Sequence, residues 1–353
     1  MAPAITEIEA PPTDTIFTPK KDVSVSTTVP SLAVQAKASL AGAVPPSKWT
    51  PMCHPRMAEV AREVDGDFIR DWGFPDAKSR QKFLDAGFSR VTCLYFPAAK
   101  DDRIHWACRL LTILFLIDDI LEEMSFEDGE RYNDRLMPIM RGDVLPDRTK
   151  PAEWIMYDMW EGMRACDRKL ADDVLEPTFT FMRAQTDRNR SVMRNLGQYL
   201  EYREKDVGKA LLSTLMCFSM GFDLTPVEKQ LVRSLERNCA KQISVVNDIC
   251  SWEKEVIASK SGHVEGSVLC SAVRILADET DLTIGSTKRL LWAMAREWSD
   301  HHDRLAARLE AAGCSENVRR YNKGLEYQMS GNEEWSLSTL RYLDVELDDT
   351  FEI

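Results

Sequence analysis

Three oxygen-bearing side chains recur every four residues in the segment NDICSWEKE: Asn247, Ser251 and Glu255. At 3.6 residues per helical turn, this spacing places an amide, a hydroxyl and a carboxylate along one helix face. Such a polar row most often marks an ordinary solvent-exposed face. A set made only of oxygen donors is also what a hard cation such as Mg²⁺ prefers, so the row is a candidate metal site.

A second acidic cluster interrupts the apolar segment LLTILFLIDDILEEM, residues 110–124. Asp118 and Glu122 are four residues apart, as are Asp119 and Glu123. Like charges at this spacing repel each other, and they do so more strongly near a buried stripe. Either the helix reaches solvent here or a cation binds the acids. Because no His or Cys lies at helical spacing beside them, the cation expected is Mg²⁺ rather than zinc or iron.

Two sites for hard cations on an acidic chain suit a diphosphate ligand. The formal net charge is -12 and no long basic block is present, which argues against nucleic acid or an anionic membrane surface as partner. Mg²⁺ takes few protein ligands and fills its other positions with phosphate oxygens and water. Basic groups would complete the site, although each is more often a surface residue. The candidates are Arg203, Lys254 and the pair Arg341 and Tyr342.

The elements that must position these residues are almost wholly helical. The 353 residues, 44% of them hydrophobic, are enough for a sizeable core. Residues 1–47, rich in Pro, Ser and Thr, are predicted to be a flexible tail, and residues 48–353 one domain. Helices are predicted at 54–64, 76–87, 101–124, 152–164, 168–186, 189–204, 207–221, 225–258, 265–278, 285–312 and 315–329. Without convincing strands, the expected architecture is an all-α bundle of about ten helices.

The cysteines and the N-terminus indicate a cellular compartment. Nine cysteines occur singly, with no CxxC pair, which is typical of reduced core thiols rather than of disulfides or zinc sites. The first residues lack the basic start and apolar run of a signal peptide, and no apolar stretch approaches about 18 residues. We therefore expect a soluble, cytoplasmic protein.

The two acidic segments, DDILE and NDICSWEKE, resemble the class I terpene cyclases of fungi that act on sesquiterpene precursors. An arginine 44 residues before Asn247 and an Arg-Tyr pair near the end fit the same pattern. The resemblance extends from about residue 48 to the end through segments such as VTCLYFPAAKDDRIHWACRLL and KGLEYQMSGNEEWS. Cys250 and Trp252 depart from it, because the family usually has tyrosines there. Both lie between the ligand positions, so metal binding is expected to persist.

The resemblance implies a helical bundle around a central active-site cavity and assigns roles to residues. Metal ligands, for three Mg²⁺ ions, would be Asp118, Asp119, Glu122, Asn247, Ser251 and Glu255. Diphosphate would be bound by Arg203, Lys254, Arg341 and Tyr342. An aromatic wall around a carbocation would comprise Tyr95, Phe115, Phe181 and Trp335, although from sequence alone each is more typical of a plain core. We expect Trp335 to lie on a C-terminal segment that closes as a lid.

The expected function is that of a lyase, a sesquiterpene cyclase that ionises farnesyl diphosphate, cyclises it to (+)-aristolochene and releases diphosphate. An alternative is a cyclase with another bicyclic or monocyclic product, such as germacrene A. A prenyl chain elongation enzyme would need a second DDxxD motif, where this chain has NDICSWEKE. A non-catalytic helical scaffold would not need both metal rows. Related enzymes are often dimers or tetramers, so a homodimer or homotetramer is expected.

Overall fold

A computed structural model describes residues 44–193 and 195–343 of the chain. The predicted tail, residues 1–47, therefore lies outside the described residues except for its last few positions. Within the described ranges the chain forms thirteen α-helices and one short 3-10 helix, η1, and no strand. The predicted all-α fold is confirmed.

The helices, in chain order, are α2 (Met57–Asp71), α3 (Ala77–Ala86), α4 (Phe88–Tyr95), α5 (Ile104–Leu121), α6 (Phe126–Arg141), α7 (Pro151–Gln185), η1 (Arg188–Ser191), α8 (Leu196–Asp206), α9 (Lys209–Met220), α10 (Pro226–Ser261), α11 (Ala272–Thr280), α12 (Ile284–Ala311), α13 (Glu316–Ser338) and α14 (Leu340–Leu343). Among these described helices, none is long and apolar enough to cross a membrane.

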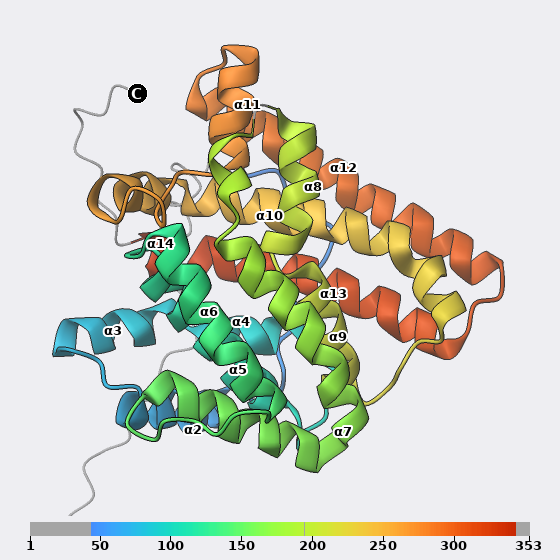
Figure 1. Ribbon diagram of the computed structural model, residues 1–353. Coiled ribbons are helices and arrows are strands. Elements are labelled where there is room, and N and C mark those ends of the chain that lie inside the picture. The colour runs from blue at the N-terminus through green and yellow to red at the C-terminus, as the bar shows by residue number, and fades with distance from the viewer. Residues whose placement is uncertain (1–43, 194, 344–353) are drawn as a thin grey trace, which may run out of the picture.

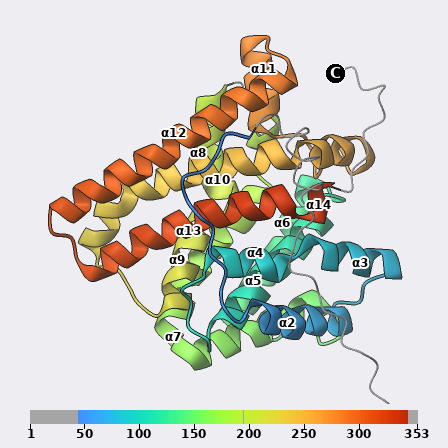
Figure 2. The ribbon, with the colours of Figure 1, turned by 180° about the vertical axis from the view of Figure 1, so that it is seen from behind.

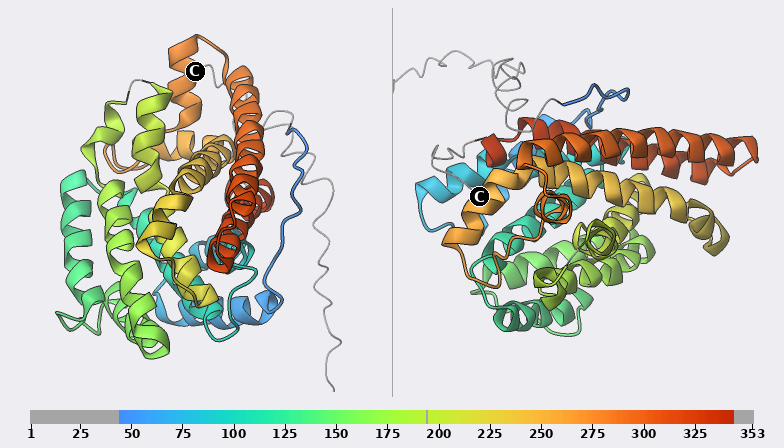
Figure 3. Two further views of the ribbon diagram at one scale, coloured as in Figure 1. Left: turned by 90° about the vertical axis from the view of Figure 1, so that its right-hand side faces the viewer. Right: turned by 90° about the horizontal axis from the view of Figure 1, so that it is seen from above.

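The long helices pack as a bundle with α10 near its middle (Figure 1). On one side α12 and α13 run along α10, as the reverse view shows (Figure 2). On the other side α7 packs on α6 and α9 (Figure 3). α5 is buried on nearly all sides, which explains why its sequence is apolar almost throughout. The acidic end of α5 and the middle of α10 consequently face the interior of the bundle.

Local sequence signals set the ends of the two helices that carry the acidic residues. α10 begins with a capping box, in which Thr225 and Glu228 satisfy each other's backbone N–H groups, and Pro226 occupies the first turn. α5 ends at Leu121, three residues after its run of acids begins at Asp118. Its last turn therefore leaves the apolar core with Asp118 and Asp119 at the boundary.

Besides the four-residue α14, two helices, α4 and α6, were not predicted from the sequence. α4 has seven buried residues among its eight, so it shows no amphipathic period. α6 contains Gly129 and Pro138 and many charges, which are typical of a loop, yet it is held by packing on α7. Asn133 of α6, for example, donates from Nδ2 to the carbonyl oxygen of Met182 at 2.8 Å. Tertiary contacts, rather than local propensity, form both elements.

Three helix boundaries differ from the predictions in ways that matter for the site. The predicted helices 152–164 and 168–186 form one helix, α7, kinked at Asp167. The helix predicted at 265–278 begins only at Ala272, so that residues 262–271 form a loop. α13 continues to Ser338 instead of ending at 329, and Trp335 is buried inside it; closure of this segment as a lid stays a prediction.

All nine cysteines are free thiols, as the sequence indicated, and most are buried.

Candidate active site

One cavity at the centre of the bundle collects the predicted site residues. It is lined by every one of them except Asp119, which lies beside Asp118 in the same acidic cluster. The remaining lining is largely aliphatic and includes Leu111, Leu114, Leu211, Leu212 and Ile243. A polar end with charged groups and an apolar end with rings and aliphatic chains therefore share one enclosed space.

The first acidic cluster lies where α5 ends. Asp118, Asp119 and Glu122 each offer a carboxylate oxygen, and these oxygens lie within 4.8 Å of one another. Burial raises the pKa of Glu122, although the ammonium of Lys254 opposes this rise. Glu123, the fourth acid of the run, is exposed and does not line the cavity. The first three acids are therefore partly removed from solvent, whereas the fourth belongs to a solvated helix end.

The second row lies on α10 and faces the same cavity. Ser251 donates from Oγ to Oε1 of Glu255 at 2.5 Å, which brings these two side chains together. Asn247 donates from Nδ2 to the hydroxyl oxygen of Tyr342 at 2.9 Å. Burial and then the carboxylate of Asp248 raise the pKa of Glu255 to about 7. The row is thus a cavity wall and not a solvent-exposed stripe.

The donors of both clusters fit a divalent metal ion. They are carboxylate, amide and hydroxyl oxygens, the set that a hard cation prefers. Three acids of one cluster held within 4.8 Å of each other, partly removed from water, repel one another. A cation between the acids would remove this repulsion, so the residues present match the group that the sequence predicted.

Two of the basic side chains are ion-paired with acids of the first cluster. Lys254 donates from Nζ to Oε1 of Glu122 at 2.5 Å. Arg341 binds both carboxylate oxygens of Asp119, at 2.5 and 3.1 Å. The groups predicted to bind an anion and those predicted to bind a cation thus neutralise each other across the cavity.

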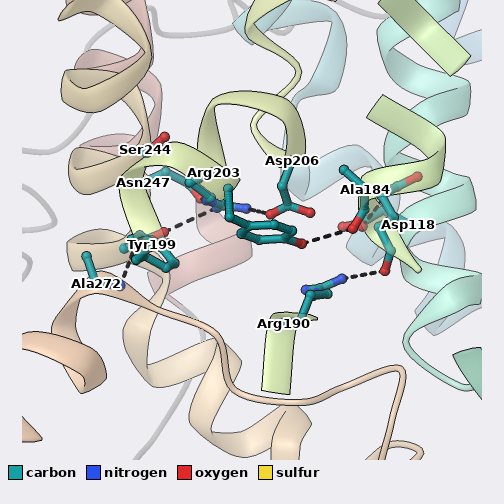
Figure 4. A network of polar contacts seen from close by, with 12 residues as sticks. Asp118, Ala184, Arg190, Tyr199, Arg203, Asp206, Ser244, Asn247 and Ala272 are labelled. Atoms are coloured by element: carbon teal, nitrogen blue, oxygen red, sulfur yellow. Dashed lines mark hydrogen bonds and ion pairs between the residues drawn. The ribbon is translucent and has the colours of Figure 1, made fainter. Parts of the chain in front are cut away.

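Arg203 is the centre of a larger polar network (Figure 4). Its guanidinium lies between Asn247 and Asp206, donating to Oδ1 of Asn247 at 3.1 Å and forming an ion pair with Asp206. It also contacts Asp248 at 3.2 Å. Asp248 in turn accepts from the hydroxyl of Tyr199 and from the backbone N–H of Ala272 at 2.8 Å. This network ties α8, α10 and the start of α11 to the metal row.

Sequence reasoning missed several residues of this network. Asp206, Asp248, Arg190 and Gln185 are not among the predicted site residues, although Asp206 and Arg190 line the cavity. Asp248 follows Asn247 directly, and Asp206 lies three residues after Arg203 on the same helix, which puts each beside a predicted residue. This closeness in sequence was the only signal for these residues, because the role of a buried carboxylate follows from its contacts in the fold and not from its position in the chain.

Two rings of the aromatic wall, Phe115 and Trp335, belong to one connected set of ring contacts. Phe115 stacks on Phe88 with centroids 4.4 Å apart and an interplanar angle of 9°. Trp335 lies 6.0 Å from Phe115 and 5.3 Å from Tyr342. Trp335 also donates from Nε1 to the carbonyl oxygen of Ala86 at 2.8 Å, which fixes its indole. Phe88, in the unpredicted helix α4, is therefore a support of the wall that the sequence did not reveal.

Two further aromatics complete the lining. Tyr95 donates its hydroxyl to Oδ1 of Asn332 at 2.9 Å, and burial raises the pKa of this phenol well above its ordinary value. Phe181 lies against Gly208, which has a positive φ of 68°. A Cβ at Gly208 would come within 3.1 Å of the Phe181 ring. The glycine therefore allows both the turn between α8 and α9 and the position of the ring.

The two positions that depart from the family pattern lie away from the cavity. Cys250 and Trp252 are both buried, and neither lines the cavity. Trp252 falls on another face of α10 than Asn247 and Ser251, whereas Cys250, three residues after Asn247, lies beside the row without lining the cavity. The expectation that they leave the metal row intact agrees with this placement.

Comparison with known proteins places these features in context. Residues 109–300 match the family model for terpene synthase family 2, C-terminal metal binding. The chain is 64% identical over 300 residues to an aristolochene synthase of Penicillium roqueforti, covering 84% of this chain and 88% of that protein. It is 61% identical over 299 residues to an aristolochene synthase of Aspergillus terreus, covering 84% and 93%. A crystal structure of aristolochene synthase from Penicillium roqueforti superposes with a TM-score of 0.75 at 62% identity, covering 84% of this chain and 99% of that chain.

Proposed function

Because this chain belongs to the terpene synthase family and shares most of its length with fungal aristolochene synthases, we propose that it converts farnesyl diphosphate to (+)-aristolochene and diphosphate. The observation that carries this proposal is the single cavity in which two rows of oxygen donors, three basic groups and an aromatic wall meet. A charged end suits the diphosphate and an apolar end suits the isoprenoid chain.

The proposed cofactor is Mg²⁺, with three ions held by the two donor rows. Asp118, Asp119 and Glu122 would hold metal at the end of α5, and the row on α10 would hold the rest. When bound, the metal ions stabilise the negative charge that develops on the departing diphosphate. The all-oxygen donor sets support Mg²⁺ over a softer metal.

The basic residues have the role of orienting the diphosphate. Arg203, Lys254 and Arg341 would donate charge-assisted hydrogen bonds to its oxygens, with the hydroxyl of Tyr342 beside them. To do so Lys254 must leave Glu122, and Arg341 must leave Asp119. Binding is thus an exchange of ion pairs, in which acids released by the basic groups become available to metal.

The apolar end would hold the carbocation and keep water away from it. Aromatic faces stabilise a cation by about 0.5 to 2 kcal/mol each. Phe115, Phe181, Tyr95 and Trp335 line the cavity for this role. Tyr95 stays a neutral phenol at physiological pH, because burial raises its pKa, and it donates to Asn332. We therefore assign no proton transfer to it and propose that the released diphosphate, held in place, exchanges the protons.

The proposal extends to the state of the protein in the cell. We propose a cytoplasmic homodimer or homotetramer, on the basis of nine free thiols and the family. Size-exclusion chromatography with light scattering would measure the mass in solution. A monomer at micromolar concentration would contradict the oligomer.

The decisive experiment is incubation of the protein with farnesyl diphosphate and Mg²⁺, followed by gas chromatography and mass spectrometry of the organic extract. We expect aristolochene as the main hydrocarbon, and chiral chromatography should assign the (+) enantiomer. A different main product, such as germacrene A, would support cyclase activity but contradict aristolochene as the product. If no hydrocarbon forms and added isopentenyl diphosphate gives a longer prenyl diphosphate, the chain elongation alternative replaces the proposal.

A further inference from the structure

A fourth cationic side chain, Arg190, lines the cavity without an assigned role. It lies on η1, the short 3-10 helix between α7 and α8. Its Nη1 donates to the backbone carbonyl oxygen of Gln185 at 2.7 Å, and its Nε is buried without a hydrogen-bond partner among the described residues. In Figure 4 the guanidinium points from below toward the part of the network that holds Asp118.

Arg190 differs from the other basic groups of the cavity in its pairing. Arg203, Lys254 and Arg341 each form an ion pair with a carboxylate. For Arg190, no carboxylate lies within 4.0 Å among the described residues, and its hydrogen-bond partner is the neutral backbone carbonyl of Gln185. A half-buried guanidinium whose Nε is buried without a partner, and which has no direct counter-ion, is expected to bind an anion that enters the cavity.

Two carboxylates nevertheless act on Arg190 from a distance. Burial alone would lower its pKa, but the charges around it, Asp206 first among the carboxylates and then Asp118, raise it above the ordinary value. Gln185 connects the same groups, since its Nε2 donates to Oδ1 of Asp118 at 2.8 Å while its carbonyl oxygen accepts from Arg190. Asp118 thus has one partner in common with Arg190 and lies within its electrostatic reach.

We propose that Arg190 is a further diphosphate-binding residue, and that it makes metal binding at Asp118 depend on diphosphate. A divalent cation bound by Asp118 would lie near the guanidinium, and the two positive charges would repel each other. A diphosphate between them attracts both the cation and the guanidinium, and these two attractions outweigh the repulsion. Arg190 therefore weakens the binding of metal alone and strengthens the binding of metal with diphosphate. This inference rests on the proposed function of the same site.

The proposal predicts opposite effects of one substitution on two affinities. Arg190→Met keeps most of the aliphatic stem and removes the charge. We expect Mg²⁺ alone to bind the variant roughly fivefold more tightly than the wild type, a typical size for coupling between two sites. We expect inorganic diphosphate, in saturating Mg²⁺, to bind roughly tenfold more weakly, because a hydrogen bond to a charged group is lost. A purely structural role would weaken both.

Isothermal titration calorimetry on the full chain measures both affinities, first with Mg²⁺ alone and then with inorganic diphosphate in the presence of Mg²⁺. Arg188→Met is the matched control, because Arg188 lies on the same short helix but is exposed and does not line the cavity. It should match the wild type in both titrations. Arg190→Lys keeps the charge and should retain the weak binding of Mg²⁺ alone. Circular dichroism verifies that each variant is folded.

The outcomes separate this inference from the proposed function. If Arg190→Met leaves both affinities unchanged, or lowers both together, the inference is overturned while hydrocarbon formation by the wild type still supports the function. If the wild type forms no hydrocarbon and does not bind diphosphate with Mg²⁺, the proposed function itself fails. Opposite shifts in the two titrations, absent in Arg188→Met, would support Arg190 as the coupling residue.

Discussion

Phe88 supports the aromatic wall from behind, and its replacement by leucine should change the products of the enzyme. The ring is 2% exposed and does not line the cavity, yet it stacks on Phe115 at 4.4 Å. The guanidinium of Arg341 lies over its ring at 5.4 Å. One residue outside the cavity thus contacts both a wall ring and a residue proposed to bind diphosphate.

The magnitude follows from the contacts that Phe88→Leu removes. The stacked pair contributes about 0.5 to 1.5 kcal/mol beyond its buried area, and the smaller side chain leaves Phe115 unsupported on one face. Together with the lost volume we expect the free energy of unfolding to fall by about 1 to 2 kcal/mol. If about 1 kcal/mol of this loss alters the relative barriers of competing pathways, the ratio of bicyclic to monocyclic and acyclic hydrocarbons falls roughly fivefold.

Phe83→Leu is the matched control for Phe88→Leu. Phe83 is also buried and contacts Phe88 at 6.1 Å, but its other ring contacts are to Phe68 and Phe74, away from the cavity. Thermal unfolding should show a similar loss of stability in both variants, whereas gas chromatography of the products should show a change in Phe88→Leu only. An unchanged product ratio in Phe88→Leu, at a measured loss of stability, would refute the support role.

Three further predictions concern metal ligands, a backbone turn and pH. Asp118→Asn or Asn247→Leu should abolish turnover of farnesyl diphosphate with helical circular dichroism unchanged; full activity would remove that residue from the metal site. Gly208→Ala should lower both stability, by about 1 kcal/mol, and aristolochene yield, because its Cβ would press on a wall ring. Gly313→Ala, also at positive φ but with open space around it, should lower stability alone; equal yields in both would contradict this. Burial lowers the pKa of His302 to about 4, below its value in the unfolded chain. The unfolded state therefore takes up a proton first as pH falls. The free energy of unfolding should decrease between about pH 6.5 and pH 4, by up to about 3 kcal/mol. Chemical denaturation at several pH values should show a smaller fall in His302→Gln, and an equal fall would exclude this residue as the cause.

The shared face of each donor row could be predicted from the sequence, because the geometry of a helix alone determines it. Spacing of four residues places Asn247, Ser251 and Glu255 on one face whatever the helix packs against. The same holds for Asp118 and Glu122, whose position at the end of an apolar run also indicated the burial boundary. For these residues local structure was sufficient.

The supports of the site could not be predicted, because they depend on contacts between distant segments. α4 has no polar face, so no period marks Phe88 as a residue behind the wall. The segment GNEEWS has the composition of a loop, yet it lies within α13, where Gly331 allows close approach of the Leu94 carbonyl: a Cβ there would come within 2.6 Å of that oxygen. Asn332 donates from Nδ2 to the carbonyl oxygen of Ile243 at 3.2 Å. Only the folded bundle supplies these partners.

The ion pairs between Lys254 and Glu122 and between Arg341 and Asp119 have a consequence for how the cavity meets its ligands. At these two pairs the cavity presents paired dipoles to solvent rather than exposed charge of one sign. The four groups therefore exert little long-range attraction on free phosphate or on free metal ions, and solution salt has little unpaired charge to screen there. Selection for diphosphate together with metal therefore takes place at short range. Each protein ion pair that breaks is replaced by two contacts, one between the basic group and the diphosphate and one between the acid and a metal ion.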